Sequence, residues 1–234
     1  MSSAYDKNFY QQGSRVAISS AAEIVPIIMQ LAAPQSVVDV GCGTGEWLSV
    51  FRSAGIADIL GVDGPWVPRE ALHIPGSNFL CHDLGNLPLT LSRRFDLAVS
   101  LEVGEHLPPA QAGRYVADLV CLAPVVLFSA ALPHQGGIEH INEQWPDYWI
   151  KLFYSHRYVC IDCIRSRVWM NNRVAFWYSQ NCFVAIKETE LEKYPSLWAE
   201  YAKRGHAVPA LVHPLNYLVK VSEIIASKKL CQNP

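Results

Sequence analysis

Two carboxylates and an imidazole stand within five residues of each other, at Glu102, Glu105 and His106. A turn could direct all three side chains to one point, and carboxylate and imidazole groups together can ligate a divalent metal ion. A fourth ligand would have to come from another segment, and His140 is the best candidate. Without a metal, His106 or His140 can act as a general base, because imidazole changes protonation near neutral pH. In a third, structural interpretation Glu105 and His106 cap the following helix.

A glycine-rich loop lies earlier in the chain, where residues 37–47 read VVDVGCGTGEW. Gly41, Gly43 and Gly45 permit a positive φ and let a ligand approach the backbone closely. After the first strand of an α/β sheet, such a loop marks the ligand crevice. Glu46 stands where a helix would receive a pyrophosphate, and its charge is wrong for that ligand. This disfavours a nicotinamide dinucleotide, whereas Asp39 before the loop suits a ligand that carries an ammonium and a sulfonium.

This segment resembles the first motif of class I methyltransferases that use S-adenosylmethionine (SAM). The resemblance implies that Asp39 faces the methionine ammonium and that the three glycines pack under the methionine and ribose. It covers residues 34–130 well and is only general for the rest of the chain. The remaining interpretation of the loop is a β–turn–α corner with no ligand.

Acidic residues follow the next two predicted strands. Asp63 can accept hydrogen bonds from both ribose hydroxyls, as in other Rossmann-like sites, or it can simply cap a turn. Trp66 can stack near an adenine, and the resemblance implies that Asp83 and Leu84 meet the adenine edge. The resemblance thus assigns the cofactor site to Asp39, Gly41, Gly43, Gly45, Asp63, Gly64, Asp83, Leu84 and Glu102.

The Glu-x-x-Glu-His pattern with a later His resembles the metal-assisted O-methyltransferases, including ubiquinone-pathway enzymes and small-RNA 2′-O-methyltransferases. The resemblance implies that Mg or Mn, held by Glu102, Glu105, His106 and His140, lowers the pKa of an acceptor hydroxyl. Family members without a metal also carry Glu-His-Leu-Pro, so catalysis by His106, His140 and Glu105 alone stays open. The chain lacks the Asn/Asp-Pro-Pro-Tyr/Phe motif of many enzymes that methylate amino groups on bases.

Short apolar runs alternate with helical stretches, which predicts an α/β, Rossmann-like, doubly wound sheet. We expect seven mostly parallel strands, an antiparallel edge hairpin closed by a short loop at 170–174, and helices on both faces. The strands are predicted at 36–40, 59–63, 78–81, 95–100, 125–130, 158–168 and 181–187, and the helices at 14–31, 46–54, 109–122 and 143–154. Residues 1–34 form an N-terminal helix with a lid at Tyr5 to Tyr10, residues 35–187 the SAM-binding domain, and residues 188–234 a helical extension that covers the sheet, caps the site or forms a homodimer contact.

The composition limits the partners. The net charge is −2 with 17% charged residues and no dense run of Lys and Arg, which makes nucleic acid an unexpected partner. Residues 1–12 lack the pattern of a signal peptide, and apolar runs such as 124–132 are too short to span a membrane. Seven cysteines, including Cys160 and Cys163 in a Cys-x-x-Cys, indicate buried thiols in a reducing, cytoplasmic compartment.

The segment from His134 to Trp149 follows the fifth strand and is expected to form the acceptor wall. Polar recognition would come from His140, Asn142, Glu143 and Gln144, and flat apolar surface from those of Trp145, Tyr148 and Trp149 that are not core. We therefore expect methyl transfer to a hydroxyl of a small-molecule or glycan-type acceptor, a sugar or a natural-product intermediate. The alternatives are metal-independent N- or C-methylation and a non-catalytic SAM-binding module.

Overall fold

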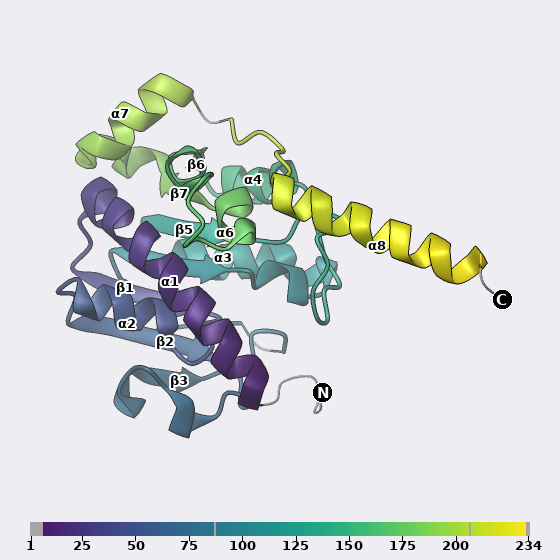
Figure 1. The fold of residues 1–234 in the computed structure, drawn as a ribbon. Coiled ribbons are helices and arrows are strands. Elements are labelled where there is room, and N and C mark those ends of the chain that lie inside the picture. Colours follow the sequence, from purple (N-terminus) through teal and green to yellow (C-terminus); the bar gives the residue numbers. More distant parts are fainter. Residues whose placement is uncertain (1–6, 87, 206, 233–234) are drawn as a thin grey trace.

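The computed structural model describes residues 7–86, 88–205 and 207–232, with the side chains of 13–86, 88–205 and 207–227. Its centre is a seven-stranded sheet in the order β3-β2-β1-β4-β5-β7-β6 (Figure 1). The first five strands of this order are parallel, whereas β7 runs antiparallel to β5 and to β6. The strands are β1 Ser36–Val40, β2 Asp58–Asp63, β3 Phe79–Cys81, β4 Leu97–Leu101, β5 Val125–Ser129, β6 Tyr158–Ile161 and β7 Phe183–Lys187. This confirms the predicted Rossmann-like fold class.

Helices cover both faces of the sheet because the central strands are apolar on both sides. Val37 and Val99 belong to one buried cluster with α1 and α2, whereas Val38 and Ala98 belong to a second cluster with α3 and α4. Successive side chains of a strand point to opposite faces, so the two clusters lie on opposite sides of the sheet. The helices are α1 Lys7–Ala32, α2 Glu46–Ser53, α3 Ala112–Leu122, α4 Pro146–Ser155, α5 Arg165–Val168, α6 Phe176–Asn181, α7 Pro195–Arg204 and α8 Pro214–Gln232.

The prediction for the antiparallel edge was wrong in detail. A strand over 158–168 and a short loop at 170–174 were expected, but β6 ends at Ile161 and 21 residues separate it from β7. Residues 165–168 form α5 and residues 176–181 form α6. Arg165 is fully buried and its guanidinium binds both carboxylate oxygens of Asp162, at 3.0 and 2.7 Å. A buried charge needs such partners, and a continuous strand would not bring this pair together.

The sequence analysis predicted the helix at 14–31 but did not count it among the apolar runs that could span a membrane. Gly13–Ala32 is long and apolar enough to span a membrane by length and composition, with a third of that window buried in the protein. Its residues Ala21, Ile24, Val25 and Ile28 are fully buried in the cluster shared with α2 and the sheet. Core helices meet the same length criterion, and this buried face is what packs α1 on the sheet. The predicted lid at Tyr5 to Tyr10 begins outside the described residues, at residues 5 and 6. The side chains of residues 7–10 are also not described.

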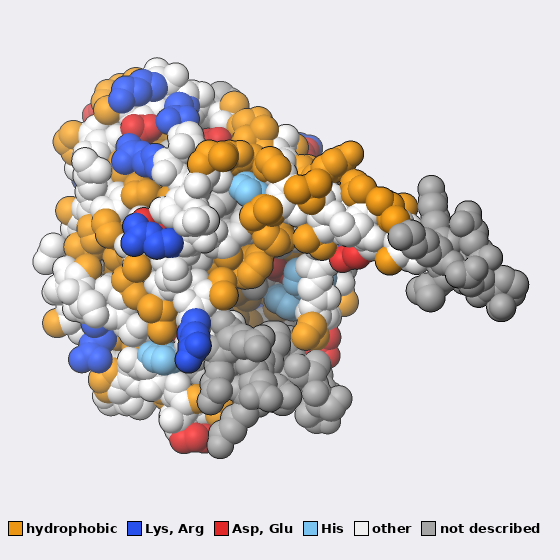
Figure 2. Space-filling model, in the orientation of Figure 1, with side chains coloured by type: hydrophobic (Ala, Val, Ile, Leu, Met, Phe, Trp, Pro, Cys, Tyr) orange, Lys and Arg blue, Asp and Glu red, His pale blue; other side chains and the backbone are white. Residues whose placement is uncertain are grey.

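The C-terminal segment is helical, with a break between α7 and α8. The 3-10 turn η5 (Glu188–Lys193) leads into α7, and α8 projects from the body (Figure 1). The start of α8 is attached through His213 and Asn216, which both bind the side chain of Gln180. Apolar side chains along α8 are exposed, among them Leu215, Leu218, Ile224 and Ile225 (Figure 2).

Candidate active site

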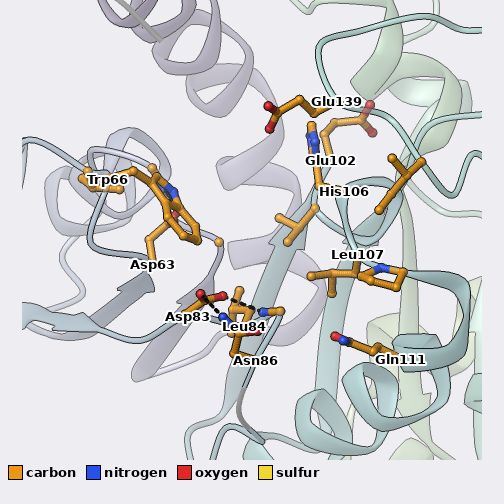
Figure 3. A pocket seen from close by; sticks show the side chains of 17 residues that line it. Asp63, Trp66, Asp83, Leu84, Asn86, Glu102, His106, Leu107, Gln111 and Glu139 are labelled. Carbon is orange, nitrogen blue, oxygen red and sulfur yellow. Dashed lines mark hydrogen bonds between the residues drawn. The ribbon is translucent and has the colours of Figure 1, made fainter. Parts of the chain in front are cut away.

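A cavity of about 500 Å³ opens where the parallel strands end. One wall comes from the segments after β1, β2 and β3, and the other from the segments after β4 and β5 (Figure 3). No lysine or arginine is among its described lining residues, whereas four of them are acidic. The lining consists of Gly41, Gly43, Asp63, Trp66, Val67, Asp83, Leu84, Gly85, Asn86, Glu102, Val103, His106, Leu107, Pro108, Gln111, Glu139 and Ile141.

The glycine loop presents bare backbone to this cavity. Gly41 and Gly43 have φ of 84° and 54°, a region that disfavours side chains. A Cβ on Gly41 would collide with the side chain of Val103, whereas one on Gly43 would meet only Glu46 Oε2, at 3.6 Å. Gly41 is thus required by packing, and Gly43 leaves open space that a ligand can fill.

Asp63 joins the loop to the end of β2. Its Oδ2 accepts a hydrogen bond from the Gly43 N–H at 2.8 Å, and its Oδ1 accepts one from the Gly64 N–H at 2.6 Å. Burial raises the pKa of Asp63, and the hydrogen bonds from Gly43, Gly64 and Trp66 partly counter that effect. Asp63 also lines the cavity, and its role as a ribose acceptor stays a prediction.

Buried negative charge gathers beneath the loop. Burial raises the pKa of Asp39 well above its usual range, and the neighbouring Asp63 and Glu46 raise it further. Thr44 Oγ1 donates a hydrogen bond to Glu46 Oε1. A cationic ligand would relieve this repulsion, because an opposite charge nearby favours ionised carboxyl groups. The acids and the open backbone at Gly43 thus fit a ligand with an ammonium and a sulfonium.

The opposite end of the cavity is shaped by the turn after β3. Asp83 Oδ1 accepts a hydrogen bond from the Gly85 N–H at 2.9 Å, and Oδ2 accepts one from Asn86 Nδ2 at 2.6 Å (Figure 3). Leu84 and the half-exposed ring of Trp66 complete an apolar slot beside Asp83. A flat, hydrogen-bonding ring such as adenine fits this combination.

Three residues predicted to bind the cofactor do not line the cavity. Asp39 lies beneath the loop, and a Cβ on Gly45 would come within 2.9 Å of Ile74. A Cβ on Gly64 would collide with the ring of Trp66. These glycines therefore permit close packing around the cavity.

Glu102 directly follows β4 and has a φ of 56°, which is uncommon for a residue with a side chain. Its carboxylate accepts hydrogen bonds from Gln135 Nε2 at 2.9 Å and from Asn181 Nδ2 at 3.0 Å. Gln180 Nε2 in turn donates to Gln135 Oε1 at 2.9 Å. The sequence analysis missed these three amides, since Asn181 was predicted to begin a strand and the amides come from segments far from Glu102. No sequence signal links them.

The other three predicted ligands do come together. The ligand atoms of Glu105, His106 and His140 lie within 4.8 Å of one another, and the two imidazole rings meet edge to face with centroids 4.8 Å apart. Glu102 is not part of this cluster, although its charge is the second cause that raises the pKa of Glu105, after burial. No hydrogen bond of ordinary geometry reaches either carboxylate oxygen of Glu105 in the described structure, although the Ala131 backbone and the Glu102 carboxyl group lie near enough to affect its pKa. Burial and the neighbouring His140 lower the pKa of His106, so its imidazole is neutral at pH 7.

The described cavity lining contains none of the residues predicted for acceptor recognition, which are His140, Asn142, Glu143, Gln144, Trp145, Tyr148 and Trp149, although two other residues of the segment are in it. Glu139 and Ile141 line the cavity, whereas Trp149 is buried against Phe128 in the core. Asn142 is also buried, and its Oδ1 accepts a hydrogen bond from Gln144 Nε2. The further lining residues Leu107, Pro108 and Gln111 follow His106 in the chain, so the segment after β4 supplies much of the acceptor side.

Comparisons with known proteins identify the family and the fold of the chain. A family described as "Methyltransferase domain" matches residues 14–151, more than half of the chain. A comparison with curated protein sequences finds no match. Among solved structures, magnesium protoporphyrin IX methyltransferase (ChlM) from Synechocystis PCC 6803 with bound SAH is similar at a TM-score of 0.54 and 18% identity, over 79% of this chain and 90% of that chain.

Two further solved structures share the fold. The plantazolicin methyltransferase BpumL, in complex with a pentazolic desmethylPZN analog and SAH, is similar at a TM-score of 0.54 and 16% identity, over 77% of this chain and 88% of that chain. An O-methyltransferase family protein from Burkholderia thailandensis is similar at 0.55 and 12% identity, over 77% of this chain and 57% of that longer chain. At these identities the likeness is one of fold.

Proposed function

We propose that this chain, which belongs to the methyltransferase domain family and is a SAM-dependent enzyme, methylates a hydroxyl oxygen of a small molecule. The bound cofactor supplies an electrophilic methyl group on its sulfonium. In the transfer the sulfur–carbon bond breaks, an oxygen–carbon bond forms, the hydroxyl proton passes to a base, and S-adenosylhomocysteine leaves. The single observation that carries the hydroxyl acceptor is the imidazole of His106 in the cavity wall, beside a second imidazole.

The proposed cofactor residues lie on both walls of the cavity. Gly41 and Gly43 offer open backbone, and Asp63 offers a carboxylate for ribose hydroxyls. Asp83 and Leu84 flank the adenine slot, and Glu102 stands where β4 ends, on the wall that also carries His106 (Figure 3). Asp39 lies in β1 before the loop and acts on the cationic cofactor through the charge of its carboxylate. We propose this assignment on the geometry of the cavity and the resemblance of the loop.

His106 has the properties that a general base needs here. A hydroxyl is a poor nucleophile until it loses its proton, and a neutral imidazole can accept that proton. Its lowered pKa keeps His106 neutral at pH 7, and Glu105 and His140 lie beside it. We assign His106 as the base; the Glu105 carboxyl group beside it can balance the charge of the imidazolium that forms, and the His140 ring packs against that of His106.

A metal-assisted variant is the second candidate, and one observation favours it. Glu105, His106 and His140 offer a carboxylate and two imidazoles to one point, a chemically suitable donor set for a divalent ion such as Mg or Mn. Such an ion would lower the pKa of a coordinated hydroxyl. Assaying with excess chelator separates the two: unchanged turnover contradicts the metal, and a loss that added Mg or Mn restores contradicts the metal-free base.

The acceptor and the reaction are tested together with SAM carrying a ¹³C-methyl group. The intact chain is incubated with panels of sugars, phenols, amines and carbon acids, and the products are read by NMR. Label on oxygen supports the proposal, whereas label on nitrogen or carbon contradicts it. Tight SAM binding without transfer to any panel would favour the non-catalytic module. The cytoplasmic location, the homodimer and the boundaries at residues 34 and 187 stay predictions.

A further inference from the structure

The carboxylate of Glu143 collects three donors from one loop. Its Oε2 accepts the His134 N–H at 2.7 Å, and its Oε1 accepts the Gly136 N–H at 2.9 Å. His140 Nδ1 lies 3.0 Å from the same Oε1. Glu143 is not in the cavity lining, so it acts on this loop and not on a ligand in the cavity.

The contact with His140 determines where the imidazole carries its proton. An ionised carboxylate only accepts hydrogen bonds, so Nδ1 must be the protonated nitrogen. In the neutral ring, the lone pair then lies on Nε2. That lone pair is what either a proton acceptor or a metal ligand requires. The position of the lone pair in His140, a member of the cluster with Glu105 and His106, thus depends on a carboxylate three residues further along the chain.

The ring of His140 has no room to turn. A Cβ on Gly137 would collide with the Nε2 and Cε1 atoms of His140, so the ring lies directly on the Gly137 backbone. His106 packs against another side with its plane nearly perpendicular, at 88°. The backbone of Gly137, the ring of His106 and the carboxylate of Glu143 all contact the His140 ring. Together these contacts favour one orientation of that ring.

Backbone hydrogen bonds also connect the 134–143 loop to Glu105, another member of the cluster. The backbone N–H groups of Ile141 and Asn142 both donate to the Glu105 carbonyl, each at 2.9 Å. His134 and Glu139 have φ of 65° and 57°, conformations that persist when surrounding contacts determine them. The hydrogen bonds from the His134 and Gly136 N–H groups to Glu143 are such contacts. The Glu143 carboxylate therefore stabilises the loop conformation and also binds the His140 imidazole.

We infer that Glu143 is the positioning residue of the active site, because it holds His140 as the Nδ1–H tautomer and clamps the 134–143 loop over Glu105 and His106. The inference rests on the proposed function, since His140 belongs to its reacting cluster. A carboxylate behind an imidazole commonly fixes its tautomer, and removing it typically lowers activity about 10–100-fold.

The first measurement needs no turnover. The protein is labelled with ¹⁵N-histidine, and the His140 signals are identified by their loss in His140→Ala. Wild type is expected to show the proton on Nδ1, and Glu143→Gln is expected to shift the ring toward the Nε2–H form. The exposed carboxylate of Asp147, which binds Lys151, provides the matched control: Asp147→Asn is expected to leave the tautomer unchanged.

The second measurement uses kinetics. Glu143→Gln is expected to lower kcat about 10–100-fold with little change in SAM affinity, because Glu143 lies outside the cavity lining. In a His140→Ala background the same substitution is expected to cause a smaller loss, because only the contacts of Glu143 with the His134 and Gly136 N–H groups remain to be removed. Additive losses in the two backgrounds would overturn the positioning role, because they would show that Glu143 acts independently of His140.

Failure of the inference is distinguishable from failure of the proposed function. A protein that shows the Nδ1–H tautomer but methylates no hydroxyl contradicts only the function. A wild-type His140 with its proton on Nε2 overturns the inference, even if Glu143→Gln does not fold.

Discussion

Replacing Glu105 with methionine is expected to stabilise the protein while it removes activity. The Glu105 side chain is fully buried, and no hydrogen bond of ordinary geometry reaches either oxygen in the described structure. Leaving a polar group buried without a partner costs about 1–3 kcal/mol. Methionine has a similar length and no such polar atoms, so the free energy of unfolding is expected to rise by about 1–3 kcal/mol. For a chain of this size that corresponds to roughly 2–4 °C in Tm for each kcal/mol.

The stability gained by replacing Glu105 with methionine is expected to depend on pH. Burial and Glu102 hold the folded-state pKa of Glu105 above its ordinary value of 4.5. The folded protein therefore binds more protons than the unfolded chain between those two values, and stability falls as pH rises through this window. The gain in Glu105→Met over wild type is thus smallest near pH 4.5 and grows toward neutral pH.

The assay is urea unfolding of cofactor-free, chelator-treated protein at several pH values, followed by methyl transfer at pH 7.5. Glu105→Gln is the matched control, because it removes the charge but keeps a buried polar group. It is expected to lose the pH-dependent part of the difference and to gain less stability than the methionine variant. A methionine variant less stable than wild type at neutral pH would refute the reasoning, as would one with full activity.

Four further outcomes follow from the site and the fold. Gly43→Val is expected to abolish SAM binding in calorimetry by filling the cavity, and binding with unchanged affinity would contradict the placement of the cofactor. Asp63→Ala is expected to weaken SAM binding by about 1–3 kcal/mol, the cost of unpaired polar groups, and an unchanged Kd would remove its ribose role. Because burial and His140 lower the pKa of His106, its neutral form persists below pH 6.5; the acid limb of kcat/KM is expected there, and His106→Ala is expected to lower kcat more than SAM affinity. A limb above pH 6.5 would exclude His106 as the base. Arg165→Met leaves Asp162 buried and unpaired and is expected to cost about 3–5 kcal/mol in urea unfolding; an unchanged midpoint would show that the pair does not stabilise the fold.

Sequence reasoning succeeded where the signal is local. The run from Asp39 through Gly45 predicts a strand, a turn with positive φ and a helix, and all three are present because glycine and strand apolarity act over a few residues. Acids that directly follow parallel strands, such as Asp63, must lie at the same edge of the sheet as that turn. The cavity lining confirms that Asp63, Asp83 and Glu102 share this edge.

Contacts between distant segments required the tertiary structure. The amides of Gln135 and Asn181 reach Glu102 from 33 and 79 residues away, and no periodicity in the chain encodes that approach. The failure at residues 158–187 has the same origin, since the buried Arg165, paired with Asp162, also donates to the distant carbonyls of Gln180 and Pro209 and so interrupts a run whose apolarity resembled one long strand.

The sequence by itself thus determined the sheet, the bend that exposes backbone to a ligand, and which strand ends carry acids, because each follows from the conformational preferences of neighbouring residues. Only the tertiary structure decided that Glu102 is bound by amides while no hydrogen bond of ordinary geometry reaches the Glu105 carboxyl group in the described structure, and that Glu143 meets His140. Those outcomes depend on how loops from different strands close on one another, which is a matter of three-dimensional packing.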